Sequence, residues 1–248
     1  MFINKIYNED CIETMAKMPN DFIDLTITSP PYNCSIDYDI YNDNRDWNEY
    51  LSWCKKWIKE LYRITKKDGR ICINVLIEMG IEGNKKRVSP FVEFYNIIRN
   101  VGFKISATPI WTDNNRPTLT AWGSWMNASS PYIYNPFEVI IIAYKDVWKK
   151  EKRGISTINK KDFMMGCSGV WKLRTQTKQI TKANFHEDLP KLCIDLLSYK
   201  GDLIYDPFMG SGTTAKVAKL SNRNFIGSEI SKEYCNIAKK RISQEVLF

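Results

Sequence analysis

The segment 201–229 constrains the fold more than any other part of the chain, because two apolar stretches flank a glycine-rich loop. Residues 201–205 predict a short buried strand, and 206–214 (Asp-Pro-Phe-Met-Gly-Ser-Gly-Thr-Thr) predict a loop that leads into a helix ending near Leu220. Residues 224–228 then predict a second strand. A strand, a glycine loop, a helix and a further strand in this order are typical of a parallel α/β sheet that holds a ligand at its carboxyl edge.

The chemistry of this loop favours a ligand with a ribose. Glycines at 210 and 212 let the backbone approach a ligand where a β-carbon would clash, and the helix that follows presents unpaired N–H groups. Glu229 ends the next strand, where a carboxylate can accept hydrogen bonds from two ribose hydroxyls. The loop alone leaves NAD, FAD and other nucleotides open, and a plain tight turn into a helix is the alternative.

A second informative segment lies near the start of the chain. The apolar run 22–27 predicts a buried strand, and Thr28-Ser29-Pro30-Pro31-Tyr32-Asn33 follows it directly. Two prolines fix the backbone and lack N–H groups, so nearby carbonyls and the Ser29 hydroxyl are available as acceptors, while Tyr32 offers an aromatic face. These groups suit a planar heterocycle that carries an amino group, such as a base swung out of nucleic acid. An ordinary Pro-Pro turn is the alternative.

Together the two segments resemble the DNA amino-methyltransferases, whose catalytic loop is Asp, Ser or Asn followed by Pro-Pro-Tyr. The resemblance implies S-adenosyl-L-methionine as cofactor, and no metal is expected, because the cysteines are scattered and the chain has one histidine. It implies that Ser29, Pro30, Pro31 and Tyr32 form the catalytic loop and that Glu229 binds the cofactor's ribose. Asp10-Cys11 matches a family pair that contacts the adenine, although Asp10 is equally suited to cap a helix. The cofactor-binding residues implied are Asp10, Cys11, Asp206, Pro207, Phe208, Gly210, Ser211, Gly212, Thr213 and Glu229.

The order of the two motifs, with the catalytic loop first, resembles the beta group of this family. We therefore expect an α/β, Rossmann-like methyltransferase fold in circularly permuted order, with both loops opening at one sheet edge. Residues 1–145, with the loop at 28–33, are expected to form the catalytic part and 183–248 the cofactor-binding part of the same domain. Residues 146–182 are expected to form an inserted target-recognition region. Residues 34–46 are either a mobile lid or a plain surface loop.

The remaining elements follow from periodicity. Helices are expected at 47–65 and 91–100, the second ended by Gly102, and strands at 3–7, 70–75 and 103–111. Residues 66–69 are expected to form a turn before the strand at 70–75. The β-branched run 136–144 is expected to pair with 103–111 in a widened hairpin. His186, the only histidine, is expected to be structural or to lie beside the cofactor. Glu187 stands where family members often have proline.

Two stretches suit contact with DNA. Aromatic residues with Arg116 occur in 114–135, and ten lysines and arginines occur together with Trp148 and Trp171 in 146–182. A solvated lysine-rich surface is the alternative. The residues expected to bind DNA are Asn33, Arg116, Lys149, Lys150, Arg153, Trp171 and Arg174. The formal net charge of +8 is compatible with a polyanionic partner.

Composition sets broader limits. The chain has 248 residues, of which 44% are apolar, and no run is long enough to span a bilayer. Seven scattered cysteines without a CxxC pair indicate neither a disulfide framework nor a zinc site. We expect a cytoplasmic protein, a monomer or a homodimer, that does not bind a membrane.

The function predicted is methyl transfer from S-adenosyl-L-methionine to N4 of a flipped cytosine in double-stranded DNA, within a restriction-modification system and beside a cognate restriction endonuclease. Ser-Pro-Pro-Tyr is commoner among N4-cytosine enzymes of the family, and Asp-Pro-Pro-Tyr among N6-adenine enzymes. N6-adenine methylation is therefore one alternative. A non-catalytic DNA-binding subunit, and an enzyme that acts on RNA or on a protein side-chain amide, are others.

Overall fold

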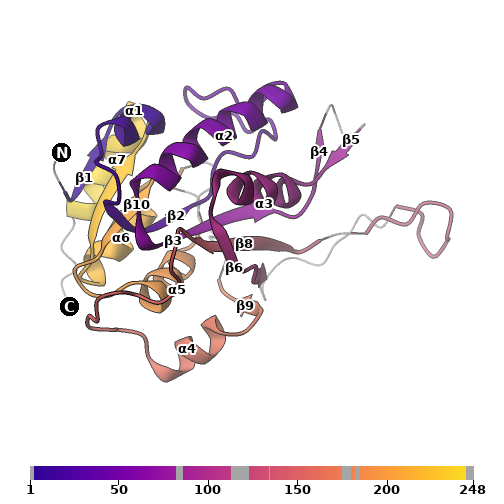
Figure 1. The fold of residues 1–248 in the computed structure, drawn as a ribbon. Helices are drawn as coiled ribbons and strands as arrows, with labels where there is room; N and C mark the ends of the chain where they lie inside the picture. Colours follow the sequence, from indigo (N-terminus) through magenta and orange to yellow (C-terminus); the bar gives the residue numbers. More distant parts are fainter. Residues whose placement is uncertain are drawn as a thin grey trace.

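A mixed sheet forms the centre of the protein and takes its strands from both ends of the chain (Figure 1). The structure is a computed structural model that describes residues 3–81, 86–112, 123–133, 135–174, 180–181 and 185–243. Along the sheet lie β1 (Lys5–Tyr7), β11 (Asn224–Ser228), β10 (Leu203–Asp206), β2 (Ile23–Thr28), β3 (Thr65–Leu76), β8 (Phe137–Tyr144), β7 (Ile110–Thr112) and β9 (Val170–Lys172), with β6 (Lys104–Ala107) also paired to β8.

The first five strands of this order are mutually parallel, so their carboxyl ends meet at one edge. β8 runs antiparallel to β3, β6 and β7, and β9 runs parallel to β7. A separate hairpin, β4 (Met79–Ile81) with β5 (Lys86–Val88), follows the carboxyl end of β3. Because β10, from the end of the chain, pairs with β2, the permuted order expected from the sequence is present in the structure.

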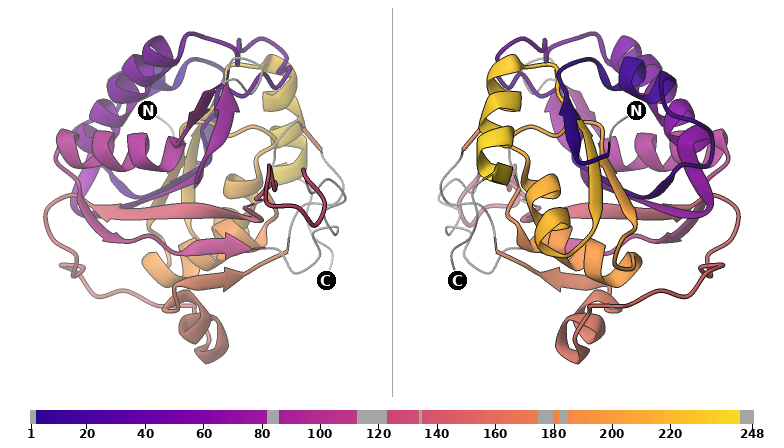
Figure 2. Two further views of the ribbon diagram at one scale, coloured as in Figure 1. Left: turned by 90° about the vertical axis from the view of Figure 1, so that its right-hand side faces the viewer. Right: turned by 90° about the vertical axis from the view of Figure 1, so that its left-hand side faces the viewer.

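Helices cover both faces of the sheet (Figure 2). One face carries α1 (Cys11–Ala16), α2 (Trp47–Ile64) and α3 (Pro90–Val101), and the other carries α4 (Lys160–Gly166), α5 (Asp188–Leu197), α6 (Thr213–Leu220) and α7 (Lys232–Ser243). A hydrophobic core lies under each layer. All six residues of β2 are buried, as expected of a strand covered on both faces.

Local sequence signals fix the ends of the helices. Asp46 caps α2 by accepting hydrogen bonds from the N–H groups of Asn48 and Glu49. Ser89 caps α3, in which proline is the first residue, and Gly102 ends it at a φ of 124° that favours glycine. The predicted helices at 47–65 and 91–100 are thus confirmed to within a residue or two.

Three expectations about strands need correction. Residues 66–69 do not form a turn but belong to β3, where the pairing with β2 is irregular between Ile23 and Leu25. The strand expected at 103–111 is broken into β6 and β7 around Pro109, which cannot donate a ladder hydrogen bond. The strand expected at 3–7 begins only at Lys5, since Asn4 has a positive φ of 60°.

The described residues of 146–182 pack along the main sheet rather than apart from it. Residues 145–153 follow the amino ends of β3 and β10, α4 packs on α5, and β9 extends the sheet beside β7 (Figure 1). No described helix is long and apolar enough to cross a membrane.

Candidate active site

A pocket opens at the carboxyl edge of the sheet, above the ends of β2, β10 and β11. Both predicted loops contribute to it, since Ser29 and Pro31 line it together with 206–211 and Thr213. The convergence of two segments that lie far apart in the sequence is therefore a structural finding. The pocket is further lined by Asp10, Cys11, Tyr38, Asp39, Ile40, Tyr41, Arg45, Trp53, Thr181, Phe185, Ser228, Glu229, Ile230, Ser231 and Tyr234.

Asp206 joins the two loops. Its carboxylate is fully buried and accepts hydrogen bonds from the hydroxyls of Thr28 (2.8 Å) and Thr214 (2.7 Å) and from the N–H of Phe208 (3.0 Å). Burial raises the pKa of Asp206 to about 6, and these three hydrogen bonds counter that rise. The carboxylate therefore fixes the end of β2 against the start of the glycine loop.

The two loop glycines are required for different reasons. Gly210 has a φ of 51°, and a β-carbon there would meet no atom closer than 3.9 Å, so the position faces open space. Gly212 has a φ of 80°, and a β-carbon would lie 2.8 Å from that of Ala238 on α7. Only Gly210 thus matches the expected close approach to a ligand, whereas Gly212 allows α7 to pack against the loop.

Arg241 of α7 holds the loop from outside, a role that the sequence analysis missed. Its guanidinium donates to the carbonyl (2.7 Å) and hydroxyl (2.8 Å) of Ser211, and to the Thr213 hydroxyl (3.2 Å). Glu187, which replaces the proline usual in the family, forms ion pairs with Arg241 (3.3 Å) and Lys216 (2.8 Å). The substitution thus supplies a carboxylate that anchors two cations beside the loop.

Glu229 closes the pocket on the side of β11. One carboxylate oxygen accepts a hydrogen bond from the N–H of Gly210 (2.8 Å), and the other accepts one from the N–H of Ser231 (2.8 Å). Burial raises the pKa of Glu229, and these hydrogen bonds counter that rise. Each carboxylate oxygen has a second lone pair, so Glu229 can still accept a hydrogen bond from a hydroxyl group of a ligand.

Asp10 and Cys11 line the same side of the pocket. Asp10 caps α1 by accepting the N–H of Ile12 at 2.7 Å, which confirms the capping role expected from the sequence. Cys11 is buried, and burial raises the pKa of its thiol well above the ordinary value. The thiol is therefore protonated and apolar at neutral pH.

The catalytic loop departs from expectation in its polar contacts. The Pro31 carbonyl is not an open acceptor, because the Tyr50 hydroxyl donates to it at 2.8 Å. Pro30 is buried and does not line the pocket. Tyr32 does not line it either, and its hydroxyl lies 2.5 Å from the Ser29 hydroxyl and 3.2 Å from Glu138. Burial raises the pKa of Tyr32 well above its ordinary value, and Glu138 raises it further.

The segment 34–46 is folded against the pocket and is not a plain surface loop. Buried Asp43 accepts three backbone N–H groups, from Asn33 (2.8 Å), Cys34 (3.0 Å) and Ile36 (3.0 Å). The Ser231 hydroxyl donates to Asp39 at 2.5 Å, which ties the segment to the far wall. That the segment 34–46 opens as a lid over the pocket stays a prediction.

Aromatic side chains form part of the pocket wall. The Trp53 ring lies 5.6 Å from that of Phe208 and 5.8 Å from that of Tyr41, and the Arg45 guanidinium lies 4.6 Å from the Tyr41 ring centre. The sequence contains no signal that Trp53 lines the pocket, because Trp53 follows the same apolar period as the buried residues of α2. His186 does not line the pocket, and its Nδ1 accepts the N–H of Asp188 at the start of α5. The structural role considered for it agrees with this contact.

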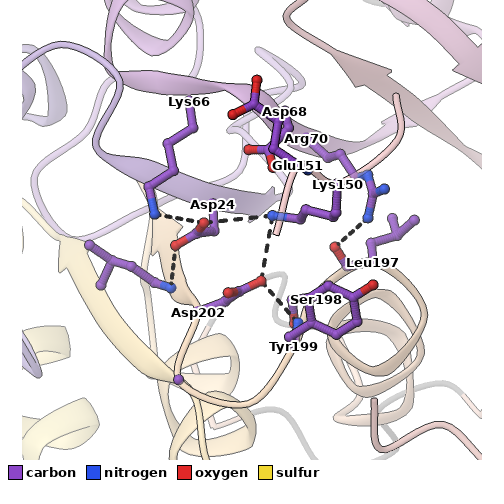
Figure 3. Close-up of polar contacts among 12 residues, drawn as sticks. Asp24, Lys66, Asp68, Arg70, Lys150, Glu151, Leu197, Ser198, Tyr199 and Asp202 are labelled. Atoms are coloured by element: carbon purple, nitrogen blue, oxygen red, sulfur yellow. Dashed lines mark hydrogen bonds and ion pairs between the residues drawn. The ribbon is translucent and has the colours of Figure 1, made fainter. Parts of the chain in front are cut away.

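Several residues expected to bind DNA do not line the pocket. The side chain of Lys150 is 8% exposed and lies at the amino edge of the sheet, 3.6 Å from Asp24 and 3.5 Å from Asp202 (Figure 3). Lys149 and Arg153 flank it on the same segment, opposite the pocket. All three residues therefore lie at the opposite edge of the sheet from the pocket, and their contact with DNA stays a prediction.

Trp171 is 0% exposed, and its indole N–H donates to the Gly166 carbonyl, so its side chain belongs to the core. Asn33 is buried and exchanges two hydrogen bonds with the Arg45 backbone, so it supports the loop instead of facing solvent. Arg174 is exposed, pairs with Asp188 at 2.8 Å and follows β9 at the carboxyl edge. Arg116 lies outside the described residues.

Comparison with known proteins identifies the family. Residues 23–240 match the model of the N6 and N4 methyltransferase family, described as DNA methylase. The type II methyltransferase M.MjaVI of Methanocaldococcus jannaschii is 38% identical over 182 residues, covering 73% of this chain and 91% of that protein. The orphan methyltransferase M.BamHII of Bacillus amyloliquefaciens is 30% identical over 251 residues, covering 91% and 90%.

Solved structures share the fold. TTHA0409 of Thermus thermophilus, described as a candidate DNA modification methylase and solved with S-adenosyl-L-methionine, superposes with a TM-score of 0.77 at 23% identity, over 98% of this chain and 94% of that one. The cytosine-N4-specific PvuII DNA methyltransferase superposes with a TM-score of 0.76 at 21% identity, over 98% and 88%. The chain therefore belongs to the N6/N4 DNA methylase family and has the α/β fold of these methyltransferases.

Proposed function

We propose that this protein transfers a methyl group from S-adenosyl-L-methionine to the N4 amino group of a cytosine swung out of double-stranded DNA. One observation carries the proposal: Ser29 of the catalytic loop lines the same pocket as the glycine loop 206–211 and Glu229. A methyl donor held by the second group of residues would therefore lie beside an amine held by the first.

The residues of the pocket fit such a cofactor. Gly210 faces open space that a side chain would fill, and Glu229 retains lone pairs for ribose hydroxyls. Cys11, Phe208 and Ile230 supply apolar contacts for an adenine, and the carboxylates of Asp10 and Asp206 favour a cation nearby. When bound, S-adenosyl-L-methionine supplies an electrophilic methyl group on a positively charged sulfur.

The role of Ser29 follows from its position at the pocket surface. An exocyclic amine is a poor nucleophile, because its lone pair is delocalised into the ring. The Ser29 oxygen accepts a hydrogen bond from one amino hydrogen of the base. This hydrogen bond favours a more tetrahedral nitrogen, whose lone pair is directed at the methyl group. Tyr32 does not line the pocket but is only half-buried, and stacking of the base on its ring beside Ser29 is part of the proposal.

The carboxyl edge of the sheet is the proposed DNA-binding face. The hairpin β4–β5 and an arm at 123–133 project from this edge (Figure 1). The arm carries no charged residue, and Trp125 and Met126 are 67% and 89% exposed. We place phosphate contacts at Arg174 and base contacts along the arm.

A transfer assay with tritium-labelled S-adenosyl-L-methionine on DNA, RNA and protein tests the substrate class. Mass spectrometry of the digested DNA then separates N4-methylcytosine from N6-methyladenine, the alternative product. Sequencing of base modifications in a host that expresses the protein, or its Ser29→Ala variant, reports the recognised site. The expected result is N4-methylcytosine in one short motif, lost in the variant.

A further part of the proposal concerns a partner enzyme. The type II names of several relatives favour a cognate restriction endonuclease that cleaves the same site.

The rival proposal, a DNA-binding subunit without turnover, predicts no binding of S-adenosyl-L-methionine in isothermal titration calorimetry. Measurable cofactor binding together with methyl transfer would exclude this rival.

A further inference from the structure

A chain of hydrogen-bonding groups leads from the pocket into the protein and reaches Glu138. The Ser29 hydroxyl lines the pocket and lies 2.5 Å from the Tyr32 hydroxyl. The Tyr32 hydroxyl lies 3.2 Å from a carboxylate oxygen of Glu138. Neither Tyr32 nor Glu138 lines the pocket, so the chain connects it to a carboxylate behind its wall.

The sheet positions this carboxylate. Glu138 lies on antiparallel β8, directly opposite Leu76 of β3, and Asn74 is two residues before Leu76. The Asn74 amide donates to Glu138 at 2.5 Å and to the Tyr32 hydroxyl at 3.1 Å. Asn74 thus holds both groups in place, while its own side-chain oxygen is buried without a partner among the described residues.

The number of available hydrogens limits how the chain can be arranged. The Tyr32 hydroxyl has one hydrogen and three acceptors within reach: the Asn74 carbonyl (3.1 Å), Glu138 and Ser29. A charged carboxylate is the strongest acceptor of the three. With Tyr32 donating to Glu138, Ser29 donates to Tyr32, and a lone pair of the Ser29 oxygen remains for an amino hydrogen from the pocket.

We infer that Ser29, Tyr32 and Glu138 form a relay that removes the proton released by the methylated amine. This inference rests on the proposed function. As the nitrogen–methyl bond forms and the sulfur–methyl bond breaks, one amino proton passes to the Ser29 oxygen. The Ser29 proton passes to the Tyr32 oxygen, the Tyr32 proton passes to Glu138, and Glu138 later releases it to solvent.

The relay explains why a serine suffices where a carboxylate would be the simpler base. The Ser29 hydroxyl alone is too weak to take a proton, but in the relay it loses one as it gains one. Burial raises the pKa of Tyr32 well above its ordinary value, so the three transfers occur together and no tyrosinate accumulates. Glu138 is thus the final base, contributed by a strand that neither sequence motif includes.

Single-turnover methyl transfer to DNA tests the relay with Glu138→Gln, which keeps the size of the side chain and removes the base. We expect a rate about 100-fold lower, in line with general-base catalysis, with the dissociation constant for S-adenosyl-L-methionine unchanged within twofold. Glu138→Asp should recover part of the rate. Glu78→Gln is the matched control, because Glu78 bonds Arg87 and Asn135 at the same edge and is not part of the chain.

Tyr32→Phe breaks the relay in the middle and keeps the ring. Combining it with Glu138→Gln should lower the rate no further than either change alone, because both interrupt one path. The rate should be slower in D₂O for the wild type, and this solvent isotope effect should be smaller in both variants. Multiplicative losses in the double variant would instead support two separate structural roles and overturn the relay.

Infrared difference spectroscopy gives a readout other than activity. Formation of product in the crystal or in concentrated complex should produce the band of a protonated carboxyl in the wild type and not in Glu138→Gln. A Glu138→Gln rate within twofold of the wild type would overturn the relay. A wild type that binds the cofactor but methylates neither DNA nor RNA would instead contradict the proposed function on which the relay rests.

Discussion

Thr28 and Asp206 are joined by a hydrogen bond of 2.8 Å between residues 178 positions apart, at the ends of neighbouring strands β2 and β10. Thr28 begins the catalytic loop and Asp206 begins the glycine loop. The distance between the two loops is therefore set by a buried contact and by the strand pairing beneath it.

Thr28→Val should lower the free energy of unfolding by about 1–3 kcal/mol, because it removes a hydrogen bond to a buried carboxylate. Thr26→Val on the same strand is the matched control, since the buried Thr26 hydroxyl has no partner among the described residues and its loss should be neutral or stabilising. Urea unfolding of both variants measures the difference. Equal effects would show that the Thr28–Asp206 contact contributes nothing specific.

Asp206→Asn should change the pH dependence of stability. Its pKa is raised from 3.8 to about 6 in the folded state, so the native protein binds the proton more tightly than the unfolded chain. This contribution is fully present below pH 3.8 and is lost as pH rises through about 6. The wild type should therefore gain up to about 3 kcal/mol relative to Asp206→Asn between pH 8 and pH 4. Urea unfolding at these values checks the sign, and a constant difference would contradict it.

Gly212→Ala should be the more damaging of two matched substitutions in the glycine loop. It adds a β-carbon 2.8 Å from that of Ala238 at a φ of 80°, and we expect a loss of about 2 kcal/mol. Gly210→Ala meets no atom closer than 3.9 Å and should cost less stability. It should instead weaken cofactor binding. Thermal unfolding and calorimetric titration of both variants would separate the packing role from the ligand-facing role.

Asp43→Ala should loosen the segment 34–46, because three backbone N–H groups lose their acceptor. We expect about tenfold weaker binding of S-adenosyl-L-methionine and faster proteolysis within the segment. Asn42→Ala is the control, since the exposed Asn42 side chain accepts a hydrogen bond from the N–H of Asn44 alone among the described residues. Unchanged proteolysis in Asp43→Ala would show that other contacts hold the wall.

Lys150→Ala should destabilise the protein without changing how DNA affinity depends on salt. The substitution leaves the carboxylates of Asp24 and Asp202 without this cation at the amino edge. Arg174→Ala, at the carboxyl edge, should reduce the slope of log affinity against log salt by about 1. Fluorescence anisotropy across a salt series measures both slopes. A reduced slope for Lys150→Ala would place DNA on the amino edge.

The parts predicted well from the sequence are those fixed by local chemistry. Proline and glycine define the two loops, and period and capping residues define α2 and α3. The common edge followed from parallel strands, whose carboxyl ends must meet there. The structure places Ser29 and Glu229 on one pocket, in agreement with that prediction.

The parts predicted poorly depend on tertiary contacts. Lys150 and Lys149 are the same residue type in sequence, and only the presence of Asp24 and Asp202 on neighbouring strands makes Lys150 a buried ion-pair partner. The sequence around Trp171 does not distinguish a buried tryptophan from one that is exposed to DNA. Glu138 could not be connected with Tyr32 either, because the register of β8 against β3 has no signal in the sequence.

The pocket takes one wall from residues 10–53 and the other from residues 181–234, and none of its described lining residues comes from the stretch between them. A nick in the connecting stretch at the amino edge would therefore divide the cavity between two fragments while leaving each of its walls intact. Neither fragment alone would recognise the methyl donor, but pairing of β2 with β10 would restore a shared cavity when the two are mixed. The fold is thus suited to division into complementing halves whose activity depends on their reunion.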